Sequence, residues 1–392
     1  MNAKEIPGGI CAPLGFTAAG TACGIKPGGL DISILAADER CSAAGTFTTN
    51  AFKAAPVRLT EEHLKKDGFL QAVVANSGNA NAWTGEQGME DARAMAVMAA
   101  EFIGAHPWDV AVASTGEIGV YLPMQRVSKG ISDAASRLNR EGGGDAALAI
   151  MTTDTRSKEL AWDLGGFAMG GMAKGSGMIR PDMATMLAFI TTDAEVEPAQ
   201  LGQALRSAVD ASFNLITIDG CTSTNDMVLV LASGASGVSL EGKEIEKHLF
   251  RACSHLSRLV VEDGEGATRF IVVRVHQAAD GEEARRAALA VAESSLVKTA
   301  VFGGDPNWGR VIQALGASLE DADSMGVSVD IAGLRVAENG KPAEVDGKKL
   351  NKAMAGKEVE LDINLGRGES EVEVWTCDLS YGYVKINTEY HT

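Results

Sequence analysis

Thr185 lies in a stretch whose composition could support nucleophilic catalysis. Residues 174–187 read KGSGMIRPDMATML, in which glycines and a proline precede an Ala-Thr step. Glycines allow unusual backbone dihedrals, and in a distorted peptide the Thr185 Oγ can attack the carbonyl of Ala184. Hydrolysis of the resulting ester would free an N-terminal threonine whose α-amine, with a pKa of about 7.7–8.0, can accept its hydroxyl proton. The stretch is therefore compatible with self-cleavage between Ala184 and Thr185.

Two other interpretations of the same glycine-rich loop are a phosphate-binding loop and an ordinary loop. A P-loop places its lysine after the glycines and directly before a Ser or Thr that opens a helix. Here Lys174 precedes the glycines, and the following AFITTDA is strand-like. The helix N-terminus that would bind phosphate is therefore missing. An ordinary loop that leads into a strand, with Thr185 a plain strand residue, stays open on these residues alone.

A threonine nucleophile also needs hydrogen-bond donors where negative charge develops. The strand-like run DVAVA is followed by STGEIG, so Thr115 offers a hydroxyl and the Thr115–Gly116 step offers backbone amides. Losing one such donor typically costs about 2.7–4 kcal/mol of transition-state stabilisation. Taken alone the Ser-Thr-Gly sequence is a weak signal, because many turns contain it.

Composition and charge exclude several other classes of function. The formal net charge of −17 argues against a general nucleic-acid or anionic-membrane surface, and 45% hydrophobic residues are typical of a globular protein. The six cysteines form no close pairs, and the six histidines lack metal-site spacing, so we expect reduced thiols and no metal. We find no signal peptide or membrane span, and expect a cytoplasmic protein.

Strand-like and helix-like segments alternate along the chain, which predicts an α/β or α+β fold. The predicted strands include QAVVANSG, DVAVASTG, NLITIDG, DMVLVLASG and TRFIVVRVH; the predicted helices include residues 88–105, 198–213 and 243–263. Near the C-terminus, VSVDIAGLRV, KEVELDINLG, SEVEVWTCDL and YVKIN predict an antiparallel, half-exposed sheet. We therefore expect a domain over residues 1–280 and a smaller α/β domain over residues 281–392.

Nine blocks in order resemble the ArgJ-type ornithine acetyltransferase family. These blocks are TFTTNAFKAAPV, NSGNAN, ASTGEIG, MTTDT, GGMAKGSGMIRPDMATML, TIDGCTSTND, GEGATR, DPNWGR and YVKINTEYHT. The resemblance implies an αββα sandwich of the DmpA/ArgJ type, made as a precursor that cleaves itself before Thr185. It further implies an α chain of residues 1–184 and a β chain of residues 185–392, paired as an α2β2 heterotetramer.

The resemblance also implies roles for individual residues. Thr185 would be the nucleophile that forms an acetyl-threonyl ester, with Thr115 and Gly116 as the oxyanion hole. The implied substrate contacts are Lys174, Glu265, Asn387, Thr392 and one threonine of MTTDT, either Thr152 or Thr153. NSGNAN and TSTND are interpreted as structural turns, because their side chains satisfy turns locally.

The implied activity is acetyl transfer from N-acetylornithine to glutamate in arginine biosynthesis, with ornithine and N-acetylglutamate as products. No cofactor is expected, although acetyl-CoA is a further donor for some family members. An amidohydrolase or aminopeptidase on the same self-processing fold is the nearest alternative. A non-catalytic metabolite-binding protein that keeps the fold is the other.

Overall fold

The computed structural model describes residues 3–180, 186–320 and 326–389 of the 392-residue chain. The chain divides into two compact units. The first comprises Met1–Asn214 and Cys221–Val260, and the second comprises Leu215–Gly220 and Val261–His391. The domain boundary predicted near residue 280 falls after the first strand of the second unit in this division.

The first unit is built on a nine-stranded sheet in the order β1-β6-β7-β8-β9-β3-β4-β5, with β2 paired to β3. Its long strand β3 is irregular between Ala36 and Cys41 in its pairing with β4, which continues to Ser42. The first half of β3 also pairs with β2, and its last six residues pair with β9. The strands are β1 (Lys4–Glu5), β2 (Phe16–Thr21), β3 (Ile32–Phe47), β4 (Phe69–Asn79), β5 (Val110–Glu117), β6 (Lys158–Asp163), β7 (Ala168–Lys174), β8 (Leu187–Thr192) and β9 (Met227–Ala232).

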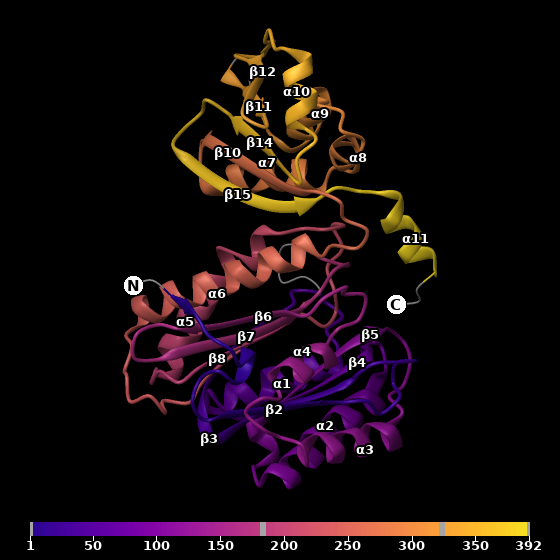
Figure 1. The fold of residues 1–392 in the computed structure, drawn as a ribbon, viewed down its shortest axis with the longest axis vertical. Coiled ribbons are helices and arrows are strands. Elements are labelled where there is room, and N and C mark those ends of the chain that lie inside the picture. Colours follow the sequence, from indigo (N-terminus) through magenta and orange to yellow (C-terminus); the bar gives the residue numbers. More distant parts are fainter. Residues whose placement is uncertain (1–2, 181–185, 321–325, 390–392) are drawn as a thin grey trace. The chain divides into compact units, whose positions relative to one another are not determined.

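Helices cover both outer faces of this folded sheet. They are α1 (Ala55–Asp67), α2 (Gly85–Ile103), α3 (Met124–Ala135), α5 (Pro198–Asp210) and α6 (Gly242–Glu262). Helix α4 (Gly143–Ala149) instead packs Ala146 and Ala147 into the core between the two halves of the sheet. In Figure 1, α2 and α3 lie beyond β2–β4, while α5 and α6 lie on the far side of β6–β8. The predicted helices over 88–105, 198–213 and 243–263 correspond to α2, α5 and α6.

The core lies between the two halves of the sheet. Leu35 of β3, Val73 of β4 and Ala113 of β5 share one cluster with Phe189 of β8 and Leu229 of β9, and all five are at most 2% exposed. The two sheet layers therefore pack face to face with helices outside, which confirms the expected α/β sandwich. The packing also brings the end of β5 into the same layered unit as the end of β7.

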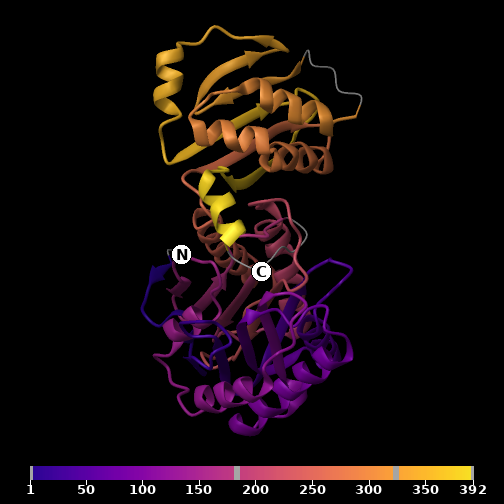
Figure 2. The same ribbon diagram turned by 90° about the vertical axis from the view of Figure 1, so that its right-hand side faces the viewer.

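The second unit has a six-stranded sheet in the order β13-β12-β11-β14-β10-β15. Helices α7, α9 and α10 cover one face of this sheet (Figures 1 and 2). The elements are β10 (Phe270–Ala278), α7 (Gly281–Glu293), α8 (Ser295–Gly303), α9 (Trp308–Ser318), β11 (Ser328–Ile331), β12 (Leu334–Glu338), β13 (Lys341–Pro342), α10 (Gly347–Ala353), β14 (Glu358–Asn364), β15 (Ser370–Cys377) and α11 (Tyr381–Glu389).

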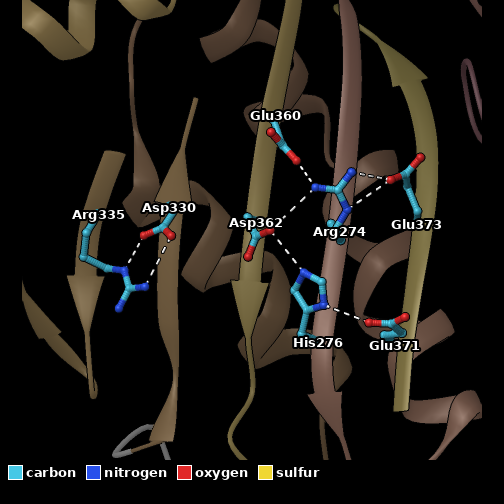
Figure 3. A network of polar contacts seen from close by, with 8 residues as sticks. All are labelled: Arg274, His276, Asp330, Arg335, Glu360, Asp362, Glu371 and Glu373. Atoms are coloured by element: carbon cyan, nitrogen blue, oxygen red, sulfur yellow. Dashed lines mark hydrogen bonds and ion pairs between the residues drawn. The ribbon is translucent and has the colours of Figure 1, made fainter. Parts of the chain in front are cut away.

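The other face of this sheet carries charged side chains. Along β10, Ile271, Val273 and Val275 face the helices, while Arg274 and His276 alternate with them on the opposite face. The charged face holds Arg274 between Glu360 and Glu373, and His276 between Asp362 and Glu371 (Figure 3). The side chains of these ion pairs are partly exposed, so each pair contributes little to stability. Contact with solvent explains why this face of the sheet is charged.

Three strand predictions for this region are wrong. NLITIDG forms a short 3-10 turn at Phe213–Leu215 and one isolated bridge from Ile216 to Trp375. YVKIN lies in helix α11, outside both of the sheets that the described residues form. The sheet is mixed rather than antiparallel, because β10 runs parallel to β14. Alternating hydrophobicity does not reveal the direction of a strand's partner.

We predict that Phe189→Ala destabilises the first unit by about 3–5 kcal/mol, because Phe189 is fully buried between the sheet layers. The urea midpoint of unfolding, followed by tryptophan fluorescence, measures the change. Phe102→Ala is the matched control: Phe102 is 54% exposed on α2, so this variant should change stability by no more than about 0.5 kcal/mol. Equal midpoints for the two variants would contradict the face-to-face packing.

Candidate active site

Thr115 and Gly116 lie at the C-terminal end of strand β5. Gly116 has a φ of +136°, and a Cβ built there would lie 2.3 Å from the carbonyl carbon of Gly78 on β4. No other residue fits this position, because L side chains rarely adopt that backbone conformation and the neighbouring strand is too close. The backbone of the predicted oxyanion hole is thus fixed by the contact between β4 and β5.

Lys174, the last residue of β7, reaches Thr115 from the other half of the sheet. It is 3% exposed, and its Nζ donates to the Thr115 Oγ1 at 3.2 Å. An ammonium group can only donate hydrogen bonds, so the Thr115 oxygen accepts and its own O–H is left to donate elsewhere. The structure therefore brings together Lys174, Thr115 and Gly116, which the sequence analysis placed in one site.

Asp154 holds the loop that follows Lys174. Its Oδ1 accepts from the Gly175 amide at 2.6 Å and pairs with the Lys158 ammonium at 2.6 Å, and the side chains of Asp154 and Lys158 are fully buried. Burial by itself opposes ionisation of Asp154, but the positive charges of Lys174 and Lys158 and the Gly175 amide outweigh it and lower its pKa to about 2. Asp154 is therefore a buried carboxylate at neutral pH.

The MTTDT segment lies against the same loop. The Thr153 Oγ1 is 2.7 Å from the Ser176 Oγ, so this hydroxyl is engaged with the KGSG sequence. The Thr152 amide donates to the Asp154 Oδ2 at 2.9 Å, and the half-buried Thr152 side chain has no hydrogen bond to any residue that the structure describes. Of the two threonines, Thr152 has the hydroxyl that is available to a ligand.

Lys26 supports the MTTDT segment from a third direction. Its Nζ donates to the Met151 carbonyl at 2.8 Å. Lys26 belongs to a loop whose four consecutive amides, from Cys23 to Lys26, donate to the fully buried Asp31 carboxylate at 2.7–3.2 Å. Burial lowers the pKa of Lys26, opposed by the negative charges of Asp31 and Asp154.

The TSTND sequence contributes two buried side chains that the sequence analysis treated as turn residues. The Asn225 Nδ2 donates to the carbonyls of Ala80 and Ser114, at 2.6 and 2.8 Å, and so holds the backbone next to Thr115. Asp226 is fully buried, and its Oδ1 accepts from the amide of Met186 at 2.8 Å. Burial raises the pKa of Asp226 well above its usual value.

In the second unit, the GEGATR loop contacts helix α11. The Asn387 Nδ2 donates to the Oε2 of the buried Glu265 at 2.7 Å, and the Tyr383 hydroxyl donates to the Asp219 carboxylate at 3.2 Å. A Cβ on Gly266 would lie 2.3 Å from the Tyr383 amide, so the loop packs tightly on the helix. Two predicted substrate contacts, Glu265 and Asn387, are therefore direct neighbours.

Three predicted site residues, Ala184, Thr185 and Thr392, lie outside the described residues. Within the described ranges, no three His, Cys, Asp or Glu side chains gather closely enough to hold a metal ion. In the same ranges, every helix is too short or too polar to span a lipid bilayer. Lys26, Asp154 and Asp226 were not predicted from the sequence. Asp154 and Asp226 are polar residues inside the MTTDT and TIDGCTSTND blocks, which was the available signal, whereas Lys26 lies outside all nine blocks.

We predict that Asp154→Asn lowers stability at about pH 7 by roughly 3–5 kcal/mol, because it removes the carboxylate 2.6 Å from the buried Lys158. The folded-state pKa of about 2 lies below the unfolded value, so the carboxylate contributes fully above about pH 4. That contribution disappears as the pH falls toward 2, so the difference in stability between wild type and Asp154→Asn should become smaller at low pH. The urea midpoints of both proteins between about pH 7 and pH 2 measure this difference.

Glu101→Gln on α2 is the control for this experiment, since it removes an exposed carboxylate. It should leave the midpoint nearly unchanged at every pH. A stability gap for Asp154→Asn that is absent near neutral pH, or that widens on acidification, would contradict the assignment of Asp154 as a stabilising buried carboxylate.

Two solved structures resemble parts of this chain. The arginine biosynthesis bifunctional protein ArgJ from Bacillus halodurans is 36% identical, with 51% of this chain and 97% of that chain covered and a TM-score of 0.49. The ornithine acetyltransferase of Mycobacterium tuberculosis, complexed with ornithine, is 40% identical, with 46% and 98% covered and a TM-score of 0.44.

Similarity to known sequences extends over the whole chain. The arginine biosynthesis bifunctional protein ArgJ from Symbiobacterium thermophilum is 52% identical, with 99% of each chain covered. Its counterpart from Bacillus licheniformis is 43% identical, with 99% of this chain and 98% of that protein covered. The sequence pattern of the ArgJ family matches residues 17–392. The chain therefore belongs to the ArgJ family.

Proposed function

We propose that the chain transfers the acetyl group of N-acetylornithine to glutamate through an acetyl ester on Thr185. Membership of the ArgJ family supports this activity over the amidohydrolase alternative, because the relatives from Symbiobacterium thermophilum and Bacillus licheniformis are both named arginine biosynthesis bifunctional proteins. The observation that carries the mechanism is the hydrogen bond from Lys174 to Thr115. It leaves the Thr115 hydroxyl as a donor beside a buried positive charge.

In the first half-reaction, the Thr185 hydroxyl attacks the acetyl carbonyl of N-acetylornithine while the free α-amine of Thr185 takes the hydroxyl proton. Negative charge develops on the carbonyl oxygen, and the Thr115 O–H and the Gly116 amide donate to it. The buried Lys174 ammonium polarises the Thr115 hydroxyl and strengthens this donation. The intermediate collapses as the amine proton passes to the leaving nitrogen, which releases ornithine and leaves acetyl-Thr185.

In the second half-reaction, the amine of glutamate attacks the acetyl ester and loses a proton to the α-amine of Thr185. The same donors stabilise the second oxyanion, and the products are N-acetylglutamate and free Thr185. Because the threonine itself carries the acetyl group between substrates, the mechanism requires no cofactor. The hydrolase alternative differs only in using water as the acceptor.

Charge and available hydroxyls suggest how the substrates bind. The Thr152 hydroxyl is the better candidate for a substrate contact, because the Thr153 hydroxyl already bonds Ser176. Glu265, held by Asn387, is suited to an ornithine ammonium. The substrate contact of Thr392 and the α2β2 assembly stay predictions from the family resemblance. Sedimentation of the cleaved protein would test the assembly.

The proposed function is tested by following N-acetylglutamate formation from N-acetylornithine and glutamate, with intact-mass measurement of the same sample. We expect two fragments, the second beginning at Thr185, and stoichiometric release of ornithine. Thr185→Ala should stay a single chain and form no product. Cleaved wild-type protein that releases only acetate and ornithine would instead support the hydrolase, and an uncleaved, inactive wild type would support a binding protein.

We predict that Thr115→Ala lowers kcat by about 10²–10³-fold, because it removes one oxyanion donor. Thr115→Ser is the matched variant: it keeps the hydroxyl that accepts from Lys174 and should retain kcat within about threefold. Steady-state kinetics on the folded, cleaved variants measures both. Equal activity of the alanine and serine variants would rule out the Thr115 hydroxyl as a donor.

A further inference from the structure

Asp226 is a buried carboxyl that is hydrogen-bonded to Met186, the residue after the proposed nucleophile Thr185. The mechanism above does not use it. Its Oδ1 accepts from the Met186 amide at 2.8 Å, and that amide belongs to the peptide bond that joins Thr185 to Met186. The Met186 carbonyl in turn accepts from the Met227 amide at 3.1 Å. Both peptide groups of Met186 are thus held by two consecutive residues, Asp226 and Met227.

We propose that Asp226 is a positioning residue for Thr185, which fixes the peptide that follows the nucleophile through its hydrogen bond to the Met186 amide. This inference rests on the proposed function of Thr185. The Met186 amide exists both before and after cleavage of the Ala184–Thr185 bond. Asp226 can therefore hold the same peptide in the precursor during self-cleavage and in the mature enzyme during acetyl transfer.

The surroundings of Asp226 suit a carboxylic acid rather than a carboxylate. Its Oδ2 is buried, and no described residue donates a hydrogen bond to it. The Thr48 hydroxyl lies beside the carboxyl and would ordinarily favour its ionised form. That hydroxyl, however, already donates its single proton to the Ser223 carbonyl at 2.7 Å, so it can offer Asp226 only a lone pair.

The charged group that acts on Asp226 is the Lys174 ammonium from β7, which opposes the effect of burial. Burial is the larger influence, and it raises the pKa of Asp226 well above its usual value. A neutral Asp226 accepts from the Met186 amide with one oxygen and carries a proton on the other. An asparagine offers an acceptor and a donor at the same two positions, whereas an alanine offers neither.

This difference defines the experiment, which compares Asp226→Ala with Asp226→Asn. In Asp226→Ala, we expect the rate of self-cleavage and the kcat of the cleaved enzyme each to fall by about tenfold or more, with KM changed less than about threefold. Asp226→Asn should keep both rates within about threefold of wild type, with an unchanged pH profile between about pH 6 and 8. Intact mass and steady-state kinetics give the two readouts.

Asp193→Ala is the matched control at the other end of β8. Asp193 is also buried, and it accepts from the amides of Ala168 and Leu14 at 2.7 and 2.9 Å. Its loss should lower stability but leave kcat of the folded enzyme within about threefold of wild type. An equal fall in kcat for Asp193→Ala would trace the effect to general loosening of β8 and overturn the proposal.

Two further results would also overturn it: an Asp226→Ala enzyme with normal cleavage and kcat, or an Asp226→Asn enzyme as impaired as Asp226→Ala. Cleavage and activity of the wild-type protein test the proposed function separately from the role of Asp226. If wild type is not cleaved before Thr185, the proposed function fails and the role of Asp226 fails with it. If wild type is cleaved and active while Asp226→Ala is unaffected, only the role of Asp226 fails.

Discussion

The hydrogen bond between the buried Lys174 ammonium and the Thr115 hydroxyl is the interaction on which the site depends. It joins the end of β7 to the end of β5, which belong to opposite layers of the sandwich. A buried ammonium is stable only beside compensating charge, and Asp154 supplies that charge while it also binds the Gly175 amide. The proposed oxyanion hole therefore depends on the buried carboxylate of Asp154, to which the proposed mechanism assigns no step.

The site can form because one long strand serves both layers. Strand β3 pairs with β4 as far as Ser42 and with β9 through its last six residues, and β8 lies next to β9. The strand ends that carry Thr115, Lys174 and Asp226 are thus held in one layered unit, although they are far apart in the sequence. Asn225 adds a cross-link, because it donates to carbonyls next to Thr115 while its neighbour Asp226 holds Met186.

Much of this arrangement could be predicted from the sequence, but its supporting groups could not. Thr115, Gly116 and Lys174 lie in motifs whose spacing matches the family, and the apolar run DVAVA predicts β5, the strand that carries Thr115 and Gly116. Strand β7, which ends at Lys174, was not predicted. Asp154 and Asp226 lie in polar segments that resemble ordinary turns, and only the tertiary fold shows that they are buried. The strand prediction for YVKIN was wrong because it rested on strand-like composition alone, and the structure has helix α11 there.

We propose above all that Thr185 carries the acetyl group between the two substrates. The most direct measurement is to incubate cleaved protein with N-acetylornithine labelled in the acetyl group, without glutamate, quench with acid, and map the label by peptide mass spectrometry. We expect labelled acetyl on Thr185, which is lost when glutamate is added and is recovered in N-acetylglutamate. Rapid formation of labelled N-acetylglutamate by protein that never carries label on Thr185 would contradict this proposal.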